Sequence, residues 1–276
     1  MISIFSCSSK RQNENIILSQ SKQEVSVVVQ TKPDAADAAF SKLAFLAMAR
    51  ANVFRLLAVA FYDPTQKFVE QLVSGSYISE LHGYYSDLVT HHNGGIEALE
   101  PLKEYQSSLS GHDPAELLKE LKIEYARLFI GPGHPAVQPY ETFYDEKLKG
   151  DSQPLLMVSP AAMAVEKAYR EAGIAMSKEL REPPDHFAVE LEFLFYLSKK
   201  ESDAWAAGDN EDAKNWRRRE LAFMDGHLGN WGQRFCSKIE TESLHPFYCS
   251  IAYFARILLR LEGSNAVTSD VDRPQS

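Results

Sequence analysis

Cysteine is scarce in this 276-residue chain, and no two of its three cysteines form a Cys-x-x-Cys pair. A disulfide framework and a four-cysteine zinc site are therefore excluded, which fits a reducing compartment. No stretch approaches about 18 uninterrupted apolar residues, so no membrane span is expected. The chain has 29 lysines and arginines against 38 acidic residues, a net charge of −9. That balance argues against nonspecific nucleic-acid binding and favours a cationic partner.

Motifs for covalent catalysis and nucleotide binding are also missing. There is no Gly-x-Ser-x-Gly elbow, and residues 131–134 (Gly-Pro-Gly-His) lack the spacing of a phosphate-binding loop. His186 and Glu190 stand four residues apart on a helical pattern beside Asp185, and such a pair could ligate a metal ion. Two ligands are too few for a site. We therefore expect no catalytic residue, no bound metal and no cofactor.

Residues 1–33 are rich in serine, glutamine and asparagine and do not resemble an export signal. Lys10 and Arg11 are followed by polar residues instead of an apolar stretch, unlike a Sec or twin-arginine leader. The segment before Cys7 lacks the charged start and apolar run of a lipoprotein signal. We expect residues 1–33 to be a flexible extension, and their role is open.

Apolar residues recur at three- and four-residue steps over residues 34–262, which is the period of amphipathic helices. Asp63 and Pro64 are expected to end the first long helix and to start the next, with Pro64 near its first turn. Asp113 followed by Pro114 is the pattern of a capped helix start.

No run of residues alternates as a half-buried strand would. The sequence therefore predicts an all-α fold: a single helical globule of about nine helices over residues 34–262, with a flexible tail at 263–276. Proline-rich breaks at 131–158 and 182–185 are candidate hinges, and long loops of this kind are often functional.

Aromatic residues form a regular series near the C-terminus. Its members stand at four-residue steps: Phe223, His227, Trp231 and Phe235. This spacing predicts a continuous ridge on one helix within about 210–240. We expect the aromatic rings to pack in the core and His227 to be a buried, hydrogen-bonded histidine. The three arginines at 217–219 are expected on a solvated helix face.

Four segments together resemble the TorD/DmsD/NarJ family of redox-enzyme maturation chaperones, and its TorD/DmsD branch most closely. They are residues 124–133 (Glu-Tyr-Ala-Arg-Leu-Phe-Ile-Gly-Pro-Gly), residues 139–144 (Pro-Tyr-Glu-Thr-Phe-Tyr), residues 182–186 (Glu-Pro-Pro-Asp-His) and the Phe-x-x-x-His-Leu-x-x-Trp stretch at 223–231. The third segment matches the family's Glu-Pro-x-Asp-His motif completely. The order and spacing of the four segments make the resemblance specific to the family.

This resemblance implies an all-helical, cytoplasmic protein whose N- and C-terminal helical parts meet at a hinge near residues 178–186. Such proteins are chaperones, not enzymes. They bind the twin-arginine leader of a molybdopterin oxidoreductase catalytic subunit. They also assist its cofactor insertion and folding, and proofread its export. GTP binding is associated with some members, but no motif here places it.

The leader-binding residues that we expect are Tyr125, Leu128, Phe129, Glu182, Asp185, His186 and Glu190. The resemblance assigns the aromatic and leucine positions and the Asp-His pair, and the glutamates are added as carboxylate partners for arginine. Two guanidinium groups followed by an apolar stretch require a carboxylate-bearing mouth beside an apolar groove. Leu128 and Phe129 are adjacent and cannot point the same way, so we expect one of them, Phe129, to lie in the core.

Two alternatives stay open at this stage. One is a metal-dependent helical hydrolase that uses Asp185, His186, Glu190 and His227. The other is an assembly factor that recognises a folded oxidoreductase surface instead of a leader. A hinge before the C-terminal helices would also permit their exchange between protomers, so the sequence allows a monomer or a domain-swapped dimer. The identity of the client oxidoreductase is open.

Overall fold

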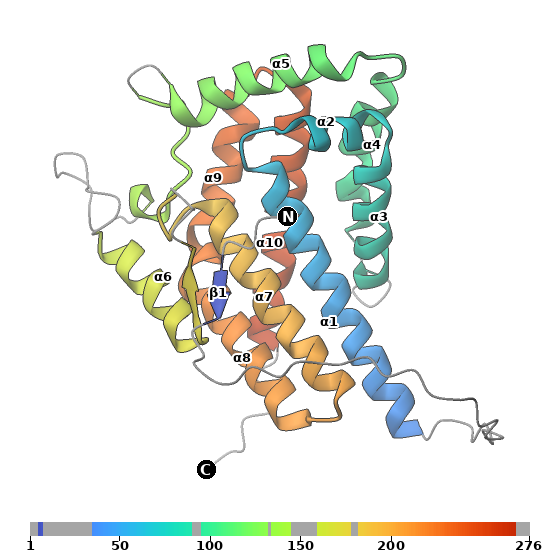
Figure 1. The fold of residues 1–276 in the computed structure, drawn as a ribbon, viewed down its shortest axis with the longest axis vertical. Helices are drawn as coiled ribbons and strands as arrows, with labels where there is room; N and C mark the ends of the chain where they lie inside the picture. Colours follow the sequence, from blue (N-terminus) through green and yellow to red (C-terminus); the bar gives the residue numbers. More distant parts are fainter. Residues whose placement is uncertain are drawn as a thin grey trace, which may run out of the picture.

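The computed structural model of the chain describes residues 5–7, 35–89, 95–131, 134–144, 159–177 and 182–268. Within these ranges it forms ten α-helices and one pair of short strands (Figure 1). The helices are α1 Ala35–Ala60, α2 Gln66–Val73, α3 Ser76–Val89, α4 Glu100–Ser108, α5 Pro114–Tyr125, α6 Pro160–Glu171, α7 Phe187–Ala206, α8 Asn210–Gly226, α9 Leu228–Glu242 and α10 Pro246–Thr268. Shorter helical turns are η1 Ile96–Leu99, η2 Ala126–Ile130 and η3 Glu141–Phe143. The all-α fold class is confirmed.

Side-chain caps explain where several helices begin. The Asp113 carboxylate accepts a hydrogen bond from the amide of Ala115, and Pro114 occupies the first position of α5, as the sequence predicts. Pro64 lies near the first turn of α2, as expected, but not within the helix. Thr65 caps α2 by accepting a hydrogen bond from the amide of Phe68 at 3.2 Å, so Pro64 lies outside the helix.

The helix expected within 210–240 is interrupted at His227, which separates α8 from α9. Gly229 is required at this break, because a Cβ atom there would lie 2.5 Å from the carbonyl oxygen of Met224. The prediction of a continuous ridge is therefore wrong. Its aromatic members are nevertheless buried in the core: Phe223, Trp231 and Phe235.

Two predictions about the chain ends need correction. Strand β1, Phe5–Cys7, pairs antiparallel with β2, Ile174–Met176, so three residues of the expected flexible extension form structure. Residues 8–34 lie outside the described part of the chain. Helix α10 continues to Thr268, beyond the boundary expected at residue 262.

One core joins the N-terminal and C-terminal helices. Helix α1 packs along α7, and α10 packs along α9 (Figure 1). The segment Phe40–Ala60 of α1 is long and apolar enough to cross a membrane, with a mean hydropathy of 1.6, but 61% of that window is buried inside the protein. Within the described residues, one hydrophobic cluster contains side chains of both α1 and α7. Domain swapping stays a prediction.

A buried ion network fastens α1 to α7, α8 and α10. The Arg50 guanidinium pairs with Glu201 of α7 and with Glu220 of α8, where Nε and Oε1 are 2.7 Å apart. Arg217 also pairs with Glu220, at 2.6 Å, and with Glu262 at 3.4 Å. Burial alone would raise the pKa of Glu220, but the two arginines hold that pKa below its usual value. Arg217 is thus half-buried and paired, contrary to the expectation of a solvated face.

We expect Arg50→Ala to lower the free energy of unfolding by about 3–5 kcal/mol, because it leaves buried carboxylates without their shared cation. Arg55→Ala is the matched control on the same helix, since Arg55 pairs with the more exposed Glu80. It should cost less than about 1 kcal/mol. Denaturant titrations of both variants would test this, and equal losses would contradict the assignment.

Candidate functional site

Two segments far apart in the sequence form one wall of the candidate site. The amide of Phe187 donates to the carbonyl oxygen of Pro139 at 2.9 Å, and the amide of Glu141 donates to the carbonyl oxygen of Asp185 at 3.0 Å. Residues 139–141 therefore run antiparallel to residues 185–187. This pairing brings the Pro-Tyr-Glu-Thr and Glu-Pro-Pro-Asp-His segments together.

The buried side chain of Asp185 holds the two segments of this wall together. Its side chain is fully buried, and its Oδ2 accepts hydrogen bonds from the amide of Thr142, at 3.0 Å, and from the Thr142 hydroxyl. That hydroxyl also contacts the hydroxyl of Ser159, which caps α6. Burial raises the pKa of Asp185, and the two bonds from Thr142 partly offset this. Asp185 therefore holds η3, α6 and α7 together and does not present its carboxylate to an arginine from outside.

His186 caps helix α7. Its Nδ1 accepts a hydrogen bond from the amide of Ala188 at 3.2 Å, so a proton on the neutral ring belongs on Nε2. Burial lowers the pKa of His186 to about 3, so the imidazole is uncharged near neutral pH. The ring stacks on Tyr62 with centroids 6.0 Å apart and meets the ring of Tyr140 edge to face at 5.4 Å.

Glu190 lies one turn further along α7 and is completely buried. Its Oε2 accepts a hydrogen bond from the indole N–H of Trp231 at 3.2 Å. Burial first, then the nearby carboxylates of Glu141 and Asp185, raise the pKa of Glu190 well above its usual value. Glu141 contacts His227 Nδ1 at 2.9 Å, which confirms the hydrogen-bonded histidine expected from the sequence. Glu190 Oε1 is buried and has no hydrogen-bond partner among the described residues, which fits a protonated carboxyl group better than a carboxylate.

A groove of about 500 Å³ opens beside this wall, and we call it the aromatic groove. Four of the seven residues expected in the site line it: Tyr125, Phe129, Glu182 and His186. The sequence did not place six further lining residues: Tyr62, Asp63, Thr65, Ile130, Pro139 and Tyr140. The other three expected residues are fully buried and do not line it: Leu128, Asp185 and Glu190. The motif at 139–144 could have indicated that Pro139 and Tyr140 belong to the site. For Tyr62, the only sequence signal was its position at the end of a helix.

Glu182 is the half-buried carboxylate of the aromatic groove. Its Oε2 accepts a hydrogen bond from the Tyr140 hydroxyl at 3.3 Å, and burial raises its pKa. Burial and then nearby carboxylates, Glu182 among them, raise the pKa values of Tyr62, Tyr125 and Tyr140. At Tyr62 the larger carboxylate contribution comes from Glu192, and only the Tyr140 hydroxyl donates a hydrogen bond to Glu182. No lysine or arginine in the described part of the chain pairs with it.

Phe129 lies where the core meets the groove. Its ring packs edge to face on Tyr125 at 5.1 Å and also contacts Tyr248, so its expected place in the core is confirmed. Leu128 lies in the same core, so the expectation that only one of the two neighbours is a core residue is wrong. Leu128 is buried more completely, and its carbonyl oxygen accepts a hydrogen bond from the amide of Val137 at 2.8 Å. Of these two neighbours, Phe129 is the one that lines the groove. The chain forms the π-helical turn η2 here, a feature that is frequent at functional sites.

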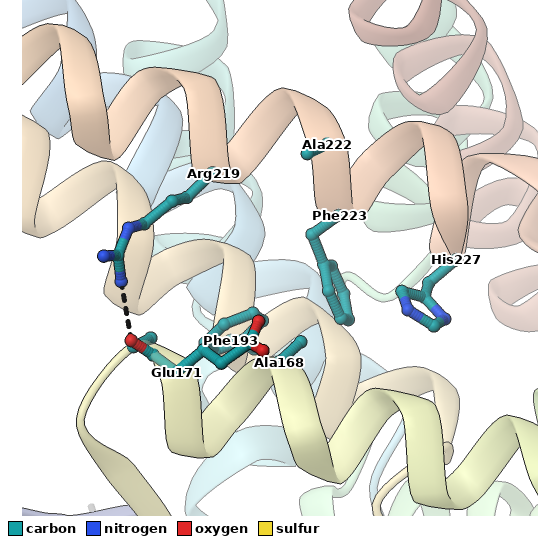
Figure 2. A pocket seen from close by; sticks show the side chains of 8 residues that line it. Ala168, Glu171, Phe193, Arg219, Ala222, Phe223 and His227 are labelled. Carbon is teal, nitrogen blue, oxygen red and sulfur yellow. Dashed lines mark hydrogen bonds between the residues drawn. The ribbon is translucent and has the colours of Figure 1, made fainter.

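A second groove of about 500 Å³ lies between α6 and α8 (Figure 2). None of the seven expected residues lines it. Figure 2 shows Arg219 reaching across to α6, where it donates to the carbonyl oxygen of Glu171 at 2.8 Å, while Phe223 and His227 project from α8. Both of its basic side chains already have partners, since His227 contacts Glu141.

The metal-dependent hydrolase alternative receives no support from this geometry. Asp185 is directed at Thr142, His186 Nδ1 is engaged with the amide of Ala188, and Glu190 contacts Trp231. Across the residues that the structure describes, no three histidine, cysteine, aspartate or glutamate side chains are grouped so as to hold a metal ion.

Several known proteins are similar to this chain in sequence. A family model described as "Nitrate reductase delta subunit" matches residues 93–237. The selenate reductase assembly chaperone protein of Thauera selenatis is 33% identical over 138 residues, which cover 49% of this chain and 66% of that protein. The chaperone protein TorD of Photobacterium profundum is 28% identical over 177 residues, 62% of this chain and 76% of that protein. A solved redox enzyme maturation protein from Archaeoglobus fulgidus is 18% identical, covering 85% of this chain and 99% of its own, with a TM-score of 0.43.

We expect Asp185→Ala to lower the free energy of unfolding by about 1.5–3 kcal/mol, because the buried amide and hydroxyl of Thr142 lose a charged acceptor. Asp63→Ala is the control, since Asp63 lies on the groove rim and is exposed. It should change stability by no more than about 0.5 kcal/mol. Denaturant titration measures both, and an Asp185→Ala variant as stable as the wild type would contradict the role assigned to Asp185.

The raised pKa of Glu190 predicts that the stability of the folded protein depends on pH. Because its pKa is raised in the folded protein, its contribution to stability is complete below the ordinary value of 4.5 and is lost as the pH rises through the raised value. Glu190→Gln stays neutral, so its stability relative to the wild type should increase from pH 5 to pH 8. Unfolding titrations across this range measure the difference, with the exposed Glu166→Gln as control. A difference that does not change with pH would contradict this.

Proposed function

Since the chain belongs to the nitrate reductase delta subunit family, we propose that it is a cytoplasmic chaperone for the maturation of a molybdopterin oxidoreductase. Relatives of this chain are named as assembly chaperones of selenate reductase and chlorate reductase. We further propose that the aromatic groove binds the twin-arginine leader of the catalytic subunit.

The observation that carries this proposal is the combination of Glu182 with three tyrosine rings in one groove. A guanidinium group is planar, so it can pair with a carboxylate through two hydrogen bonds and also stack on an aromatic ring. Glu182 accepts a bond from Tyr140 and has no cationic partner among the described residues. An arginine would supply that cation and stabilise the ionised form of Glu182.

The rest of the groove suits the segment that follows the arginines. Phe129 and Ile130 provide apolar surface beside Glu182. Asp63 adds a second carboxylate at the rim, where it faces Lys122 at 3.5 Å in an exposed and therefore weak pair. The net charge of −9 attracts a basic leader from a distance, and salt weakens this attraction.

Binding alone is enough for this function. A leader that lies in the groove is not available to the export machinery, so the fraction of bound leader sets how much precursor can leave. Release after cofactor insertion then permits export. No covalent step is required of this chain. Retention and release of the precursor both depend on the equilibrium between bound and free leader.

We expect a synthetic peptide with two adjacent arginines before an apolar stretch to bind the wild-type protein, as measured by titration calorimetry. Glu182→Gln should weaken this binding about 10- to 100-fold, since it removes a charge-assisted contact worth about 1.5–3 kcal/mol. A peptide with two lysines should bind the wild type less tightly, and Glu182→Gln should reduce that preference for arginine.

Glu171→Gln is the matched control, because Glu171 is an exposed carboxylate at the second groove. It should leave the affinity for the peptide unchanged. Failure of the wild type to bind the arginine peptide would contradict the proposed function. Undiminished binding of a client that lacks its leader would favour recognition of a folded oxidoreductase surface instead.

A further inference from the structure

The second groove, between α6 and α8, has an apolar floor. Phe193 of α7 and Phe223 of α8 are almost completely buried there, and their rings meet edge to face at 4.7 Å. Figure 2 shows these two rings between the helices that form the walls. The walls carry small side chains, which leave the space above the rings open: Ala168, Ala172 and Ala222. A groove of about 500 Å³ with this lining is large enough to receive apolar side chains of a ligand.

Two cations lie on aromatic rings beside this groove. The Arg219 guanidinium carbon is 5.0 Å from the centroid of the Trp216 ring, and Lys200 Nζ is 5.7 Å from the centroid of the Tyr196 ring. The two rings meet edge to face at 6.1 Å. The Tyr196 hydroxyl donates to the carbonyl oxygen of Ala172, a residue of the groove wall, at 3.3 Å. We call Tyr196, Lys200, Trp216 and Arg219 the basic ridge, and it is continuous with the second groove.

The positive charge of the basic ridge is not compensated within the described part of the chain. Arg219 donates to the carbonyl oxygen of Glu171, which is neutral and occupies one of the five N–H donors of the guanidinium group. No carboxylate of the described residues pairs with Arg219 or with Lys200. The acidic side chains nearby have partners of their own. Glu171 pairs with Lys167 at 3.6 Å, and Asp212 accepts a hydrogen bond from the indole N–H of the ridge at 2.9 Å.

We propose that the second groove binds an acidic, apolar peptide segment of a partner protein. The apolar side chains of that segment lie over Phe193 and Phe223, and its carboxylates pair with the basic ridge. Charge complementarity carries this inference, because two uncompensated cations border an apolar floor in a chain whose net charge is −9. A guanidinium group that stacks on a ring keeps its N–H edge available for a carboxylate.

The basic ridge also separates the two grooves by charge. A leader with two arginines meets like charge at Arg219, whereas it meets the carboxylate of Glu182 in the aromatic groove. The partner of the second groove is therefore a different segment from the leader. This inference goes beyond the proposed function and does not depend on it.

The test uses the full-length protein and a synthetic peptide in which leucine and phenylalanine are interspersed with glutamate. A second peptide has glutamine in place of each glutamate, and both are titrated by calorimetry. The wild type should bind the glutamate peptide more tightly. Arg219→Gln should weaken binding of the glutamate peptide about fivefold and change binding of the glutamine peptide little. Ala222→Gln should weaken binding of both peptides, because the larger side chain occupies part of the groove.

Arg218→Gln is the matched control. Arg218 is the neighbour of Arg219 on α8, is exposed and does not line the second groove, so the variant loses the same charge at a different place. It should bind both peptides as the wild type does. Arg219 and Ala222 are also exposed, so the melting curves of all three variants should match that of the wild type.

The possible outcomes are distinct. A wild type that binds neither peptide, or binds both equally, would overturn the inference. Equal effects of Arg218→Gln and Arg219→Gln on the glutamate peptide would also overturn it, since only long-range attraction would then be present. The twin-arginine peptide is titrated in parallel, and Arg219→Gln should not weaken its binding. Failure of the wild type to bind that peptide would contradict the proposed function and leave the present inference standing.

Discussion

The hydrogen bonds between Asp185 and Thr142 are the constraint on which the site depends. They hold residues 139–142 against the start of α7, in the part of the chain where the backbone pairs antiparallel. That pairing directs Tyr140 and His186 toward the aromatic groove and sets Glu141 beside Glu190. A carboxylate in this position can receive both the amide and the hydroxyl of Thr142, which an apolar residue cannot do. We therefore propose that Asp185, which the family resemblance assigns to binding, acts by positioning the residues that line the groove.

Three glutamates of the protein lie in environments that favour different charge states. Glu220 is buried and ionised beside two arginines, whereas the pKa of buried Glu190 is raised, which favours its protonated form. Glu182 is different, because it lies half-buried in a groove and no cation of the described chain pairs with it. The ionised form of a half-buried carboxylate without a cationic partner is stabilised when a ligand brings a positive charge. The proposed binding of a basic leader therefore rests on where these charges lie and requires no reactive group.

Much of the fold could be predicted from short-range signals. Asp113 begins its helix as the sequence indicates, because an N-cap depends on residues two or three positions away. The break at His227 could not be predicted, since His227 fits the helical period and the break needs the close approach of Gly229 to Met224. The strand pair between Phe5–Cys7 and Ile174–Met176 joins segments too far apart for any local pattern.

The site was predicted only in part, because local spacing does not show which side chains the tertiary contacts direct toward the groove. Spacing shows that Asp185, His186 and Glu190 share one end of a helix, but not which of them reaches the groove. Only His186 does so, because its ring projects past the helix start, while Asp185 and Glu190 turn inward to Thr142 and Trp231. The contribution of Tyr62 depends on where α1 ends relative to α7, which is a tertiary relation.

The most direct test of the account is a photo-crosslinking measurement. A leader peptide with a photoreactive residue next to its two arginines would be irradiated with the protein, and the attachment site would be found by mass spectrometry. The account predicts attachment within the aromatic groove, at Tyr62, Tyr125 or Tyr140. Attachment at the groove between α6 and α8, near Phe193 and Phe223, would contradict it.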